Sequence, residues 1–427
     1  MSYYVYPDSI HKNGDSSYCI KVMDDCDVLS VTGSDITLFE GDLVAESSEN
    51  EKLFPLTVEN SKIIMKLFDF TRPKSHKGQN ASIGLGDRLG LATIGHIRLV
   101  RDYDIFPVFA QQSIRELNLT GRTYEDVLAS AVWAVFREGY TTGYGADGDH
   151  LKTHEEVKYA LDCGYTMITL DCSEHIPHGL EAVVKFATDI YNEHIRGKDI
   201  DFELSIDETQ TVTTPEDHLF VAESLQTNGV EIISLAPRFC GEFQKGIDYI
   251  GDVKQFEKEF KIHTDIAEKF GYKISVHSGS DKFSVFPTIG RLSNGKYHLK
   301  TAGTNWLEAV RVIAEKAPEL YREIHTFALE NLPEARKYYH ITCDISKITP
   351  IENTRDENLP LYLDENNSRQ VLHITYGLIL QAKNNDGTSR FHERIYQVLR
   401  KNESDYTAAL EKHIGKHLTM LGVKKLH

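Results

Sequence analysis

The sequence of 427 residues predicts an α/β protein whose centre is a closed (β/α)8 barrel of the TIM type. Eight short apolar runs recur between residues 82 and 304, and most are followed by Gly or a charged residue. Helical segments with capping residues separate several of these runs, and strands that alternate with such helices form parallel sheets. Eight strands in succession favour closure into a barrel, although an open doubly wound sheet would also give this alternation.

We expect the eight strands near residues 82–86, 105–110, 140–145, 166–171, 201–207, 230–236, 272–277 and 297–302. In the clearest of them, Ile274 and Val276 alternate with Ser275 and His277. Successive side chains of a strand point to opposite faces, so the apolar pair faces the helices and the polar pair faces the barrel interior. The active sites of such barrels lie at the carboxyl ends of the strands.

The segments between the strands carry helix start and stop signals. Thr123 and Asp126 form a capping-box pattern at the start of a helix over 123–138, and Gly139 ends it. Further helices are expected over 153–164, 252–270, 306–315 and 318–329. A loop-rich stretch at 340–370 then precedes helices that continue to the last residue.

These patterns divide the chain into three predicted parts. Residues 1–80 form a small β-rich N-terminal extension, residues 81–330 the barrel, and residues 331–427 a mainly helical C-terminal extension that packs on the barrel. The first part has β-prone segments at 18–22, 28–32 and 35–39 and ends in a polar connector at 72–80.

The composition excludes several classes of protein. A formal net charge of −17 argues against a nucleic-acid partner or an anionic membrane surface. The six cysteines are scattered without a Cys-x-x-Cys pair, which fits reduced thiols in a cytoplasmic protein. We find neither a signal-peptide pattern nor an apolar run long enough to span a membrane. Segments outside a barrel often form subunit contacts, so a homodimer is one possible assembly.

The alternation rule brings three strong polar groups to the mouth of the barrel. Asp171, Asp207 and His277 end the fourth, fifth and seventh strands on the inward face. Two carboxylates and an imidazole suit a divalent transition metal such as Mn, Co, Ni or Zn. The alternative is that each side chain caps a loop, but buried carboxylates are costly unless they are paired or bound to metal.

Two glycine-rich segments invite comparison with ligand-binding loops. Residues 143–150, placed after the third strand, contain Asp149, which either completes the site or caps the helix that follows. Residues 83–90 superficially resemble a dinucleotide loop, but their glycine spacing is shifted and they open no clear helix. We therefore expect no nicotinamide cofactor.

Several cations are expected at the mouth of this otherwise acidic protein. Candidate groups that bind a substrate carboxylate or phosphate are Arg238, Lys245, Lys282, Lys300 and Gln111. Glu242, which follows the sixth strand, is a candidate acid–base group. His373 lies in an apolar segment outside the barrel, where it is either a core residue or a further metal ligand delivered by a helix folded over the mouth.

Five motifs resemble those of the tagaturonate/fructuronate epimerases, bacterial enzymes of hexuronate breakdown. The motifs lie at residues 84–90, 144–150, 237–246, 277–283 and 300–306, and the resemblance spans roughly residues 80–380. It implies epimerisation at C4 of a 2-keto hexuronate, dependent on a divalent metal. A metal-dependent aldolase, an epimerase or isomerase of a related sugar, and a non-catalytic sugar-acid-binding protein are the alternatives.

The expected chemistry is cleavage and re-formation of the C3–C4 bond through an enediolate, because the C2 carbonyl does not acidify the C4 hydrogen. In this hypothesis Asp207, His277 and His373 hold the metal, while Asp171 or Glu242 moves the C4 hydroxyl proton. Asp149 belongs either with the metal ligands or with the acid–base groups. Transient oxidation at C4 by a bound nicotinamide is the competing mechanism.

Overall fold

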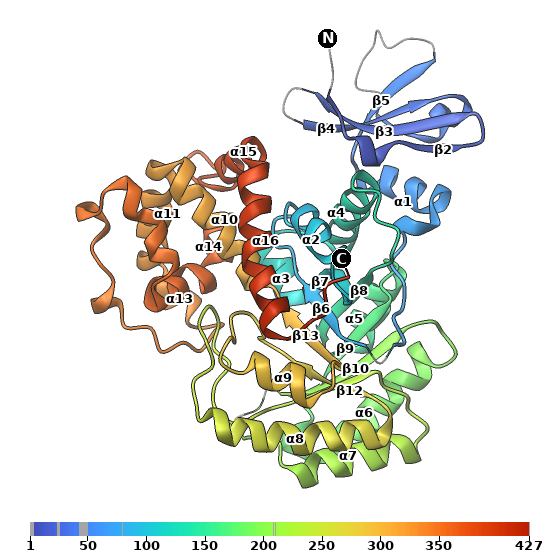
Figure 1. Cartoon of the computed structure of the whole chain (residues 1–427), viewed down its shortest axis with the longest axis vertical. Coiled ribbons are helices and arrows are strands. Elements are labelled where there is room, and N and C mark those ends of the chain that lie inside the picture. The colour runs from blue at the N-terminus through green and yellow to red at the C-terminus, as the bar shows by residue number, and fades with distance from the viewer. Residues whose placement is uncertain are drawn as a thin grey trace.

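The computed structural model describes residues 4–23, 26–41, 50–78, 80–207, 209 and 211–426. Its centre is a closed barrel of eight parallel strands in the order β10-β11-β12-β13-β6-β7-β8-β9 (Figure 1). The strands are β6 (Ser82–Leu85), β7 (Phe106–Ser113), β8 (Gly145–Leu151), β9 (Met167–Asp171), β10 (Asp201–Ile206), β11 (Ser234–Pro237), β12 (Lys273–Val276) and β13 (Tyr297–Thr301). The predicted fold class is confirmed.

The third barrel strand is the one that the sequence placed wrongly. It was expected at 140–145, but β8 begins at Gly145, and the supposed glycine-rich turn forms the strand itself. Gly143 has a φ of 99°, which breaks the extended chain just after the β-prone residues that suggested a strand there. Pairing with β7 and β9 then holds a Gly- and Asp-rich segment of low β-propensity in the barrel.

The helices around the barrel confirm the capping signals. They include α2 (Thr93–Val100), α3 (Ile114–Thr120), α4 (Tyr124–Arg137), α5 (His154–Asp162), α6 (Leu180–Ile190), α7 (Pro215–Thr227), α8 (Val253–Phe270) and α9 (Phe286–Leu292). Thr123 and Asp126 form the expected capping box of α4. Gly271, with a φ of 80°, ends α8 in the left-handed conformation that glycine favours.

The N-terminal part is an antiparallel sheet that stands beyond α4 in Figure 1. It comprises β1 (Tyr4–Val5), β2 (His11–Asn13), β3 (Ser16–Met23), β4 (Cys26–Thr32) and β5 (Glu51–Pro55), followed by α1 (Val58–Leu67). The strand expected at 35–39 is instead a 3-10 helix over Ser34–Leu38. Gly33 turns the chain there with a φ of 94°, and the Asp35 amide donates to Ser16 Oγ at 3.0 Å.

The C-terminal helices form a second hydrophobic cluster beside the barrel (Figure 1). They are α10 (Gly303–Lys316), α11 (Pro318–Glu330), α12 (Leu332–Ala335), α13 (Asn366–Ile374), α14 (Tyr376–Gln381), α15 (His392–Lys401) and α16 (Glu403–Met420). One carboxylate joins three distant segments: Asp281, after β12, accepts from Arg369 of α13 at 2.7 Å and contacts His413 of α16 at 2.6 Å. Asp281 thereby connects the barrel to two of the C-terminal helices. The division of the chain at residues 80 and 330 stays a prediction.

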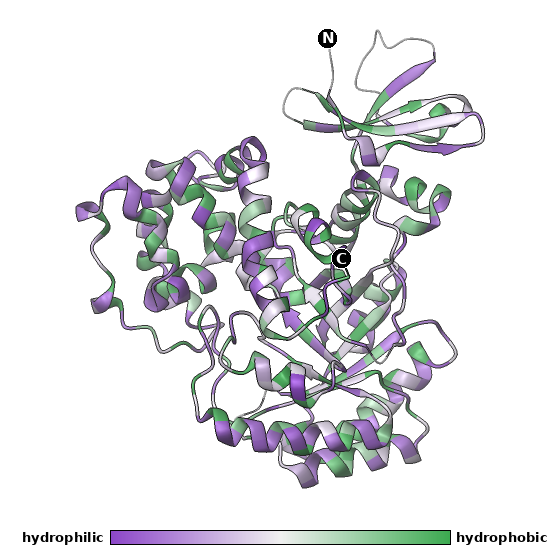
Figure 2. Cartoon of the chain, in the orientation of Figure 1, coloured by the Kyte–Doolittle hydropathy of each residue, from purple (hydrophilic) through white to green (hydrophobic). Residues whose placement is uncertain are grey.

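Hydrophilic and hydrophobic residues are interspersed along the helices (Figure 2). Within the described residues, the helices are all too short or too polar to cross a membrane. A cytoplasmic location and a homodimer stay predictions of the sequence.

Candidate active site

A cavity of about 420 Å³ opens at the carboxyl ends of the barrel strands. Its wall is formed by the ends of the strands, by the loops that follow β6, β11 and β12, and by α13. This is the end of a barrel at which catalytic groups gather. The cavity therefore defines the site that the inward-facing residues were expected to form.

The floor of the cavity is a buried ionic cluster centred on Lys300, in β13. The Lys300 ammonium lies 2.7 Å from Asp147 Oδ2, 2.7 Å from Asp149 Oδ1 and 3.0 Å from Glu203 Oε1. It also donates to the hydroxyl of Thr169. Because buried charges must be paired, this arrangement fixes Lys300 beneath the cavity and orients the carboxylates around it.

The pKa values of the two aspartates of β8, Asp147 and Asp149, are shifted in opposite directions by this environment. Burial raises the pKa of Asp147 to about 6, despite its contact with Lys300. Burial also opposes ionisation of Asp149, but His150 and Lys300 hold the pKa of that carboxyl well below its usual range. Asp149 is therefore the ionised partner of His150, while Asp147 titrates near neutral pH.

His277 lies above this floor between two carboxylates. Its Nε2 is 2.8 Å from Glu203 Oε1, and its Nδ1 is 3.3 Å from Asp207 Oδ2. Burial alone would lower the pKa of His277, but the Asp207 and Glu203 carboxylates raise it to about 10. Without a metal the ring is therefore an imidazolium held by two anions.

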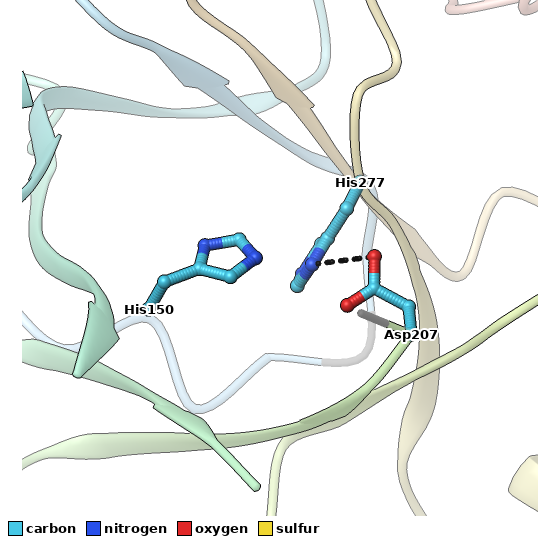
Figure 3. Close-up of side chains that lie close together, drawn as sticks. All are labelled: His150, Asp207 and His277. Atoms are coloured by element: carbon cyan, nitrogen blue, oxygen red, sulfur yellow. Dashed lines mark ion pairs between the residues drawn. The ribbon is translucent and has the colours of Figure 1, made fainter. Parts of the chain in front are cut away.

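His150 completes a group of three potential metal ligands with Asp207 and His277 (Figure 3). One ligand atom from each residue lies within 4.8 Å of the others. The His150 Nδ1 lies 2.7 Å from Asp149 Oδ1, which orients the ring. His150 has a φ of 55°, a strained conformation for a non-glycine residue that is often found at functional sites.

Each potential ligand also has a polar partner on the side away from the group. Glu203 bonds His277 Nε2, Asp149 bonds His150 Nδ1, and Ser205 donates to Asp207. Carboxylates in this outer position are typical of metal-binding histidines, because they fix the ring and raise its basicity. The His277 Nδ1 is buried and has no hydrogen-bond partner among the described residues, although it faces Asp207. These residues fit a divalent ion.

The lining of the cavity also includes a buried guanidinium. Arg88 Nε and Nη2 donate to Glu116 Oε1 at 3.1 and 2.8 Å, and the guanidinium lies 3.7 Å above the Tyr376 ring. Its Nη1 is buried without a hydrogen-bond partner in the part of the chain that the structure describes. Because Arg88 lines the cavity, this end of the site offers a donor to an anionic ligand.

Comparison with known proteins identifies the family. The model of the tagaturonate epimerase family, UxaE, matches residues 6–183 and 179–421. A tagaturonate/fructuronate epimerase from Thermotoga maritima is 41% identical over 415 residues, covering 85% of each chain. The chain belongs to the tagaturonate epimerase family.

Solved structures of this family agree with the fold. The native crystal structure of the fructuronate-tagaturonate epimerase UxaE from Cohnella laeviribosi matches with a TM-score of 0.95 and 46% identity. A glycerol complex of the same enzyme matches equally well, and each comparison covers 99% of this chain and 97% of the other. The resemblance inferred from the five motifs is thus confirmed as family membership.

Most of the predicted site residues line the cavity of this chain. They are Gln111, Asp149, Asp207, Arg238, Glu242, Lys245, His277, Lys282, Lys300 and His373. Gln111 reaches its place because β6 has Gly84 opposite, where a Cβ atom would lie 1.6 Å from the Gln111 Oε1. Glu242 accepts from Gln244, and its side chain remains 45% exposed.

Two predicted substrate ligands have other partners. Lys282 is buried and donates to the carbonyls of Gln244, Ile247 and Ser280 at 2.7–2.9 Å, so it ties two loops together. Lys300 is held by the carboxylate cluster. Arg238 and Lys245 remain better placed for an anion, and the Lys245 ammonium donates to Ser278 at 2.8 Å.

Asp171 does not line the cavity. Its Oδ1 accepts from the Ser173 amide at 2.8 Å, and its Oδ2 lies 3.4 Å from Lys152 Nζ. The structure therefore gives it the loop-capping contacts that were the alternative for each predicted ligand.

His373 lines the cavity but belongs to none of the three potential metal-binding groups found among the described residues. Its ring packs against Gly303, where a Cβ atom would lie 1.8 Å from the His373 Cε1. Burial holds the pKa of His373 well below its usual range, so the ring is neutral.

Sequence reasoning missed His150, Glu203 and Asp147 as site residues, and Arg88 as a cavity cation. A strand placed at 145–151 would have turned Asp147 and Asp149 inward. Arg88 lies inside the motif at residues 84–90, but its partner Glu116 is 28 residues away, so local patterns did not place its guanidinium in the cavity.

Proposed function

We propose that this chain is a metal-dependent epimerase that interconverts D-tagaturonate and D-fructuronate by inverting C4. The observation that carries the proposal is the group of His150, Asp207 and His277, each with an outer polar partner, at the mouth of a cavity that also contains a buried guanidinium. The names of the Thermotoga and Cohnella relatives support the same pair of substrates.

His150, Asp207 and His277 would hold the divalent ion, for which Mn, Co, Ni or Zn are suitable given two imidazoles and a carboxylate. Such an ion supplies Lewis-acid stabilisation of negative charge on substrate oxygens. The described residues around it carry four carboxylates (Asp147, Asp149, Glu203 and Asp207) and two cations (Lys300 and His277). This excess of negative charge favours a dication.

The proposed reaction is a retro-aldol cleavage followed by aldol addition. Glu242 takes the proton of the C4 hydroxyl, and the electron pair of that O–H bond forms a carbonyl at C4. The C3–C4 bond breaks, and its electron pair leaves a three-carbon enediolate. The aldehyde fragment rotates, C3 attacks its other face, and Glu242 returns the proton to the C4 oxygen. Glu242 takes this role because Asp171 lies outside the cavity.

The carboxylate at C6 needs a cationic partner away from the acidic group. Arg88, Arg238 and Lys245 line the cavity and supply that charge. A guanidinium can bind a carboxylate through two parallel hydrogen bonds, so Arg88 and Arg238 would also orient the substrate. This contact holds the aldehyde fragment in the cavity while the C3–C4 bond is broken.

Incubation with tagaturonate, followed by NMR, tests the function. We expect fructuronate to form, chelator to abolish its formation, and Mn²⁺, Co²⁺ or Ni²⁺ to restore it. Accumulation of three-carbon products instead would identify an aldolase. Incorporation of ¹³C from labelled dihydroxyacetone into the hexuronate supports bond cleavage, whereas a tightly bound nicotinamide that is reduced during turnover would refute it.

A further inference from the structure

A second group of potential metal ligands lies in the helices outside the barrel, and none of its members lines the cavity. It consists of His154, the first residue of α5, with Glu193 and His194 in the π-helical turn Tyr191–Ile195 that continues α6. We propose that these three side chains form a second divalent-metal site, which binds a borderline ion such as Zn²⁺ with water in the remaining position.

The distances within this group fit a tetrahedral ion. His154 Nδ1 lies 3.1 Å from His194 Nε2 and 3.1 Å from Glu193 Oε2, and His194 Nε2 lies 3.6 Å from Glu193 Oε1. Ligand atoms about 2.0–2.1 Å from a tetrahedral zinc ion are about 3.3 Å apart. The two Glu193 distances run to different carboxylate oxygens, and one ligand atom from each of the three side chains lies within 4.8 Å of the others, so a small adjustment of the side chains would bring them around one ion.

The Glu193 carboxylate places a negative charge beside both rings, so the group offers a cation one anionic and two imidazole ligands. The two histidine side chains are 36% and 10% exposed, which leaves the group accessible to an ion.

The local backbone holds the ligands in place. π-helical turns are rare, and they occur frequently at functional sites. The His154 ring also packs edge-on against Phe186 of α6, with ring centroids 6.2 Å apart. Imidazole and carboxylate ligands from two rigid helices are the composition expected of a zinc or nickel site rather than a calcium site.

A metal at this position would join the two helices that flank the catalytic strands. α5 follows β8, which carries His150, and the π-helical turn precedes β10, after which Asp207 lies. The inferred ion stabilises this side of the barrel and takes no part in the reaction. The inference is independent of the proposed function, because none of its ligands lines the cavity.

Metal counting on the untagged, full-length protein tests the inference. After dialysis against micromolar Zn²⁺, we expect H154A/H194A to retain one equivalent fewer than the wild type and to turn over tagaturonate at the wild-type rate. E193Q should lower the zinc affinity of the same site at least tenfold, although it keeps both imidazole rings. H175A is the matched control, since His175 stacks on Phe186 at 4.1 Å but lies outside the group, and it should bind zinc like the wild type.

Two further measurements keep the outcome clear. Zn²⁺ should raise the melting temperature of H277A, whose cavity site is disrupted, but not that of H154A/H194A/H277A. Failure of the proposed cavity site would leave the difference between wild type and H154A/H194A intact. Equal zinc content and affinity in the wild type, H154A/H194A and E193Q would overturn the inference, as would binding that is lost on dialysis.

Discussion

Glu203 Oε1 lies 2.8 Å from His277 Nε2 and 3.0 Å from Lys300 Nζ, so one buried carboxylate links the potential metal ligand to the ionic floor of the cavity. Ser234 Oγ donates to the other oxygen of Glu203 at 2.5 Å. Both oxygens of the carboxylate are thereby fixed. The contact with Glu203 in turn orients the ring of His277, so that its Nδ1 points toward Asp207.

The first prediction concerns this outer partner. Glu203→Gln keeps the size of the side chain but removes the charge that orients His277, and mutation of such partners typically costs about 10–100-fold in metal affinity. We expect a loss in that range, measured by competition with a fluorescent chelator. Glu259→Gln, on the outer helix α8, is the control. Unchanged metal affinity in E203Q would contradict the carboxylate–histidine–metal arrangement.

The second prediction is that metal binding releases a proton. The pKa of His277 is raised to about 10 in the metal-free protein, so the ring is charged at pH 7.5 and must become neutral to bind a metal. We expect about one proton released per ion at this site, and an affinity that rises with pH up to about 10. Calorimetry in buffers of different ionisation enthalpy measures the release.

The raised pKa of His277 also affects the stability of the metal-free protein, which should fall as the pH rises. A histidine whose folded pKa exceeds its unfolded value stabilises the fold fully below about pH 6.5 and loses that contribution as the pH rises through about 10. The metal-free wild type should therefore lose melting temperature between pH 7 and pH 10 more than H277Q does. Parallel curves for the two proteins would show that His277 is not held as an imidazolium.

The third prediction concerns Arg88 as an anchor for the substrate carboxylate. Hydrogen bonds to charged groups contribute about 1.5–3 kcal/mol, so Arg88→Met should lower kcat/KM for tagaturonate by about 10–150-fold. Because Glu116 would then be left unpaired, R88M/E116Q is the variant that separates binding from folding. Arg98→Met is the control, since Arg98 makes a similar double contact with Glu138 at 3.0 Å outside the cavity.

Activity on a neutral substrate sharpens this test. If Arg88 binds the carboxylate, R88M/E116Q should lose activity on tagaturonate while any activity on tagatose, which lacks the carboxylate, stays unchanged. An equal loss on both substrates would assign Arg88 a purely structural role.

The fourth prediction separates two lysines that the sequence had treated alike. Lys282→Met leaves three buried carbonyls without a donor, and each unsatisfied group costs about 1–3 kcal/mol. We expect a loss of several degrees in melting temperature. Lys245→Met should instead raise KM for tagaturonate with little change in melting temperature. The reverse pattern would restore Lys282 as the substrate ligand.

Alternating polarity was sufficient to find Asp207 and His277, because β10 and β12 have apolar residues on one face only. It failed for β8, where Gly145, Ala146 and Gly148 give no apolar face and a neighbouring tyrosine-rich segment has the higher β-propensity. Lys282 shows a different limit. The sequence places its ammonium near the mouth, but two of the three carbonyls that bind it come from a loop 35–38 residues earlier, and local patterns do not report such contacts.

The contacts of Asp281 with Arg369 and His413 tie the mouth of the barrel to α13 and α16. During synthesis the eight strands emerge from the ribosome more than a hundred residues before α16 does. The loop after β12 cannot adopt its final form until that helix has been made. The entrance of the barrel is therefore completed only once α16 has been made, and the same helix adds Ile414 and Leu418 to the hydrophobic core around the barrel.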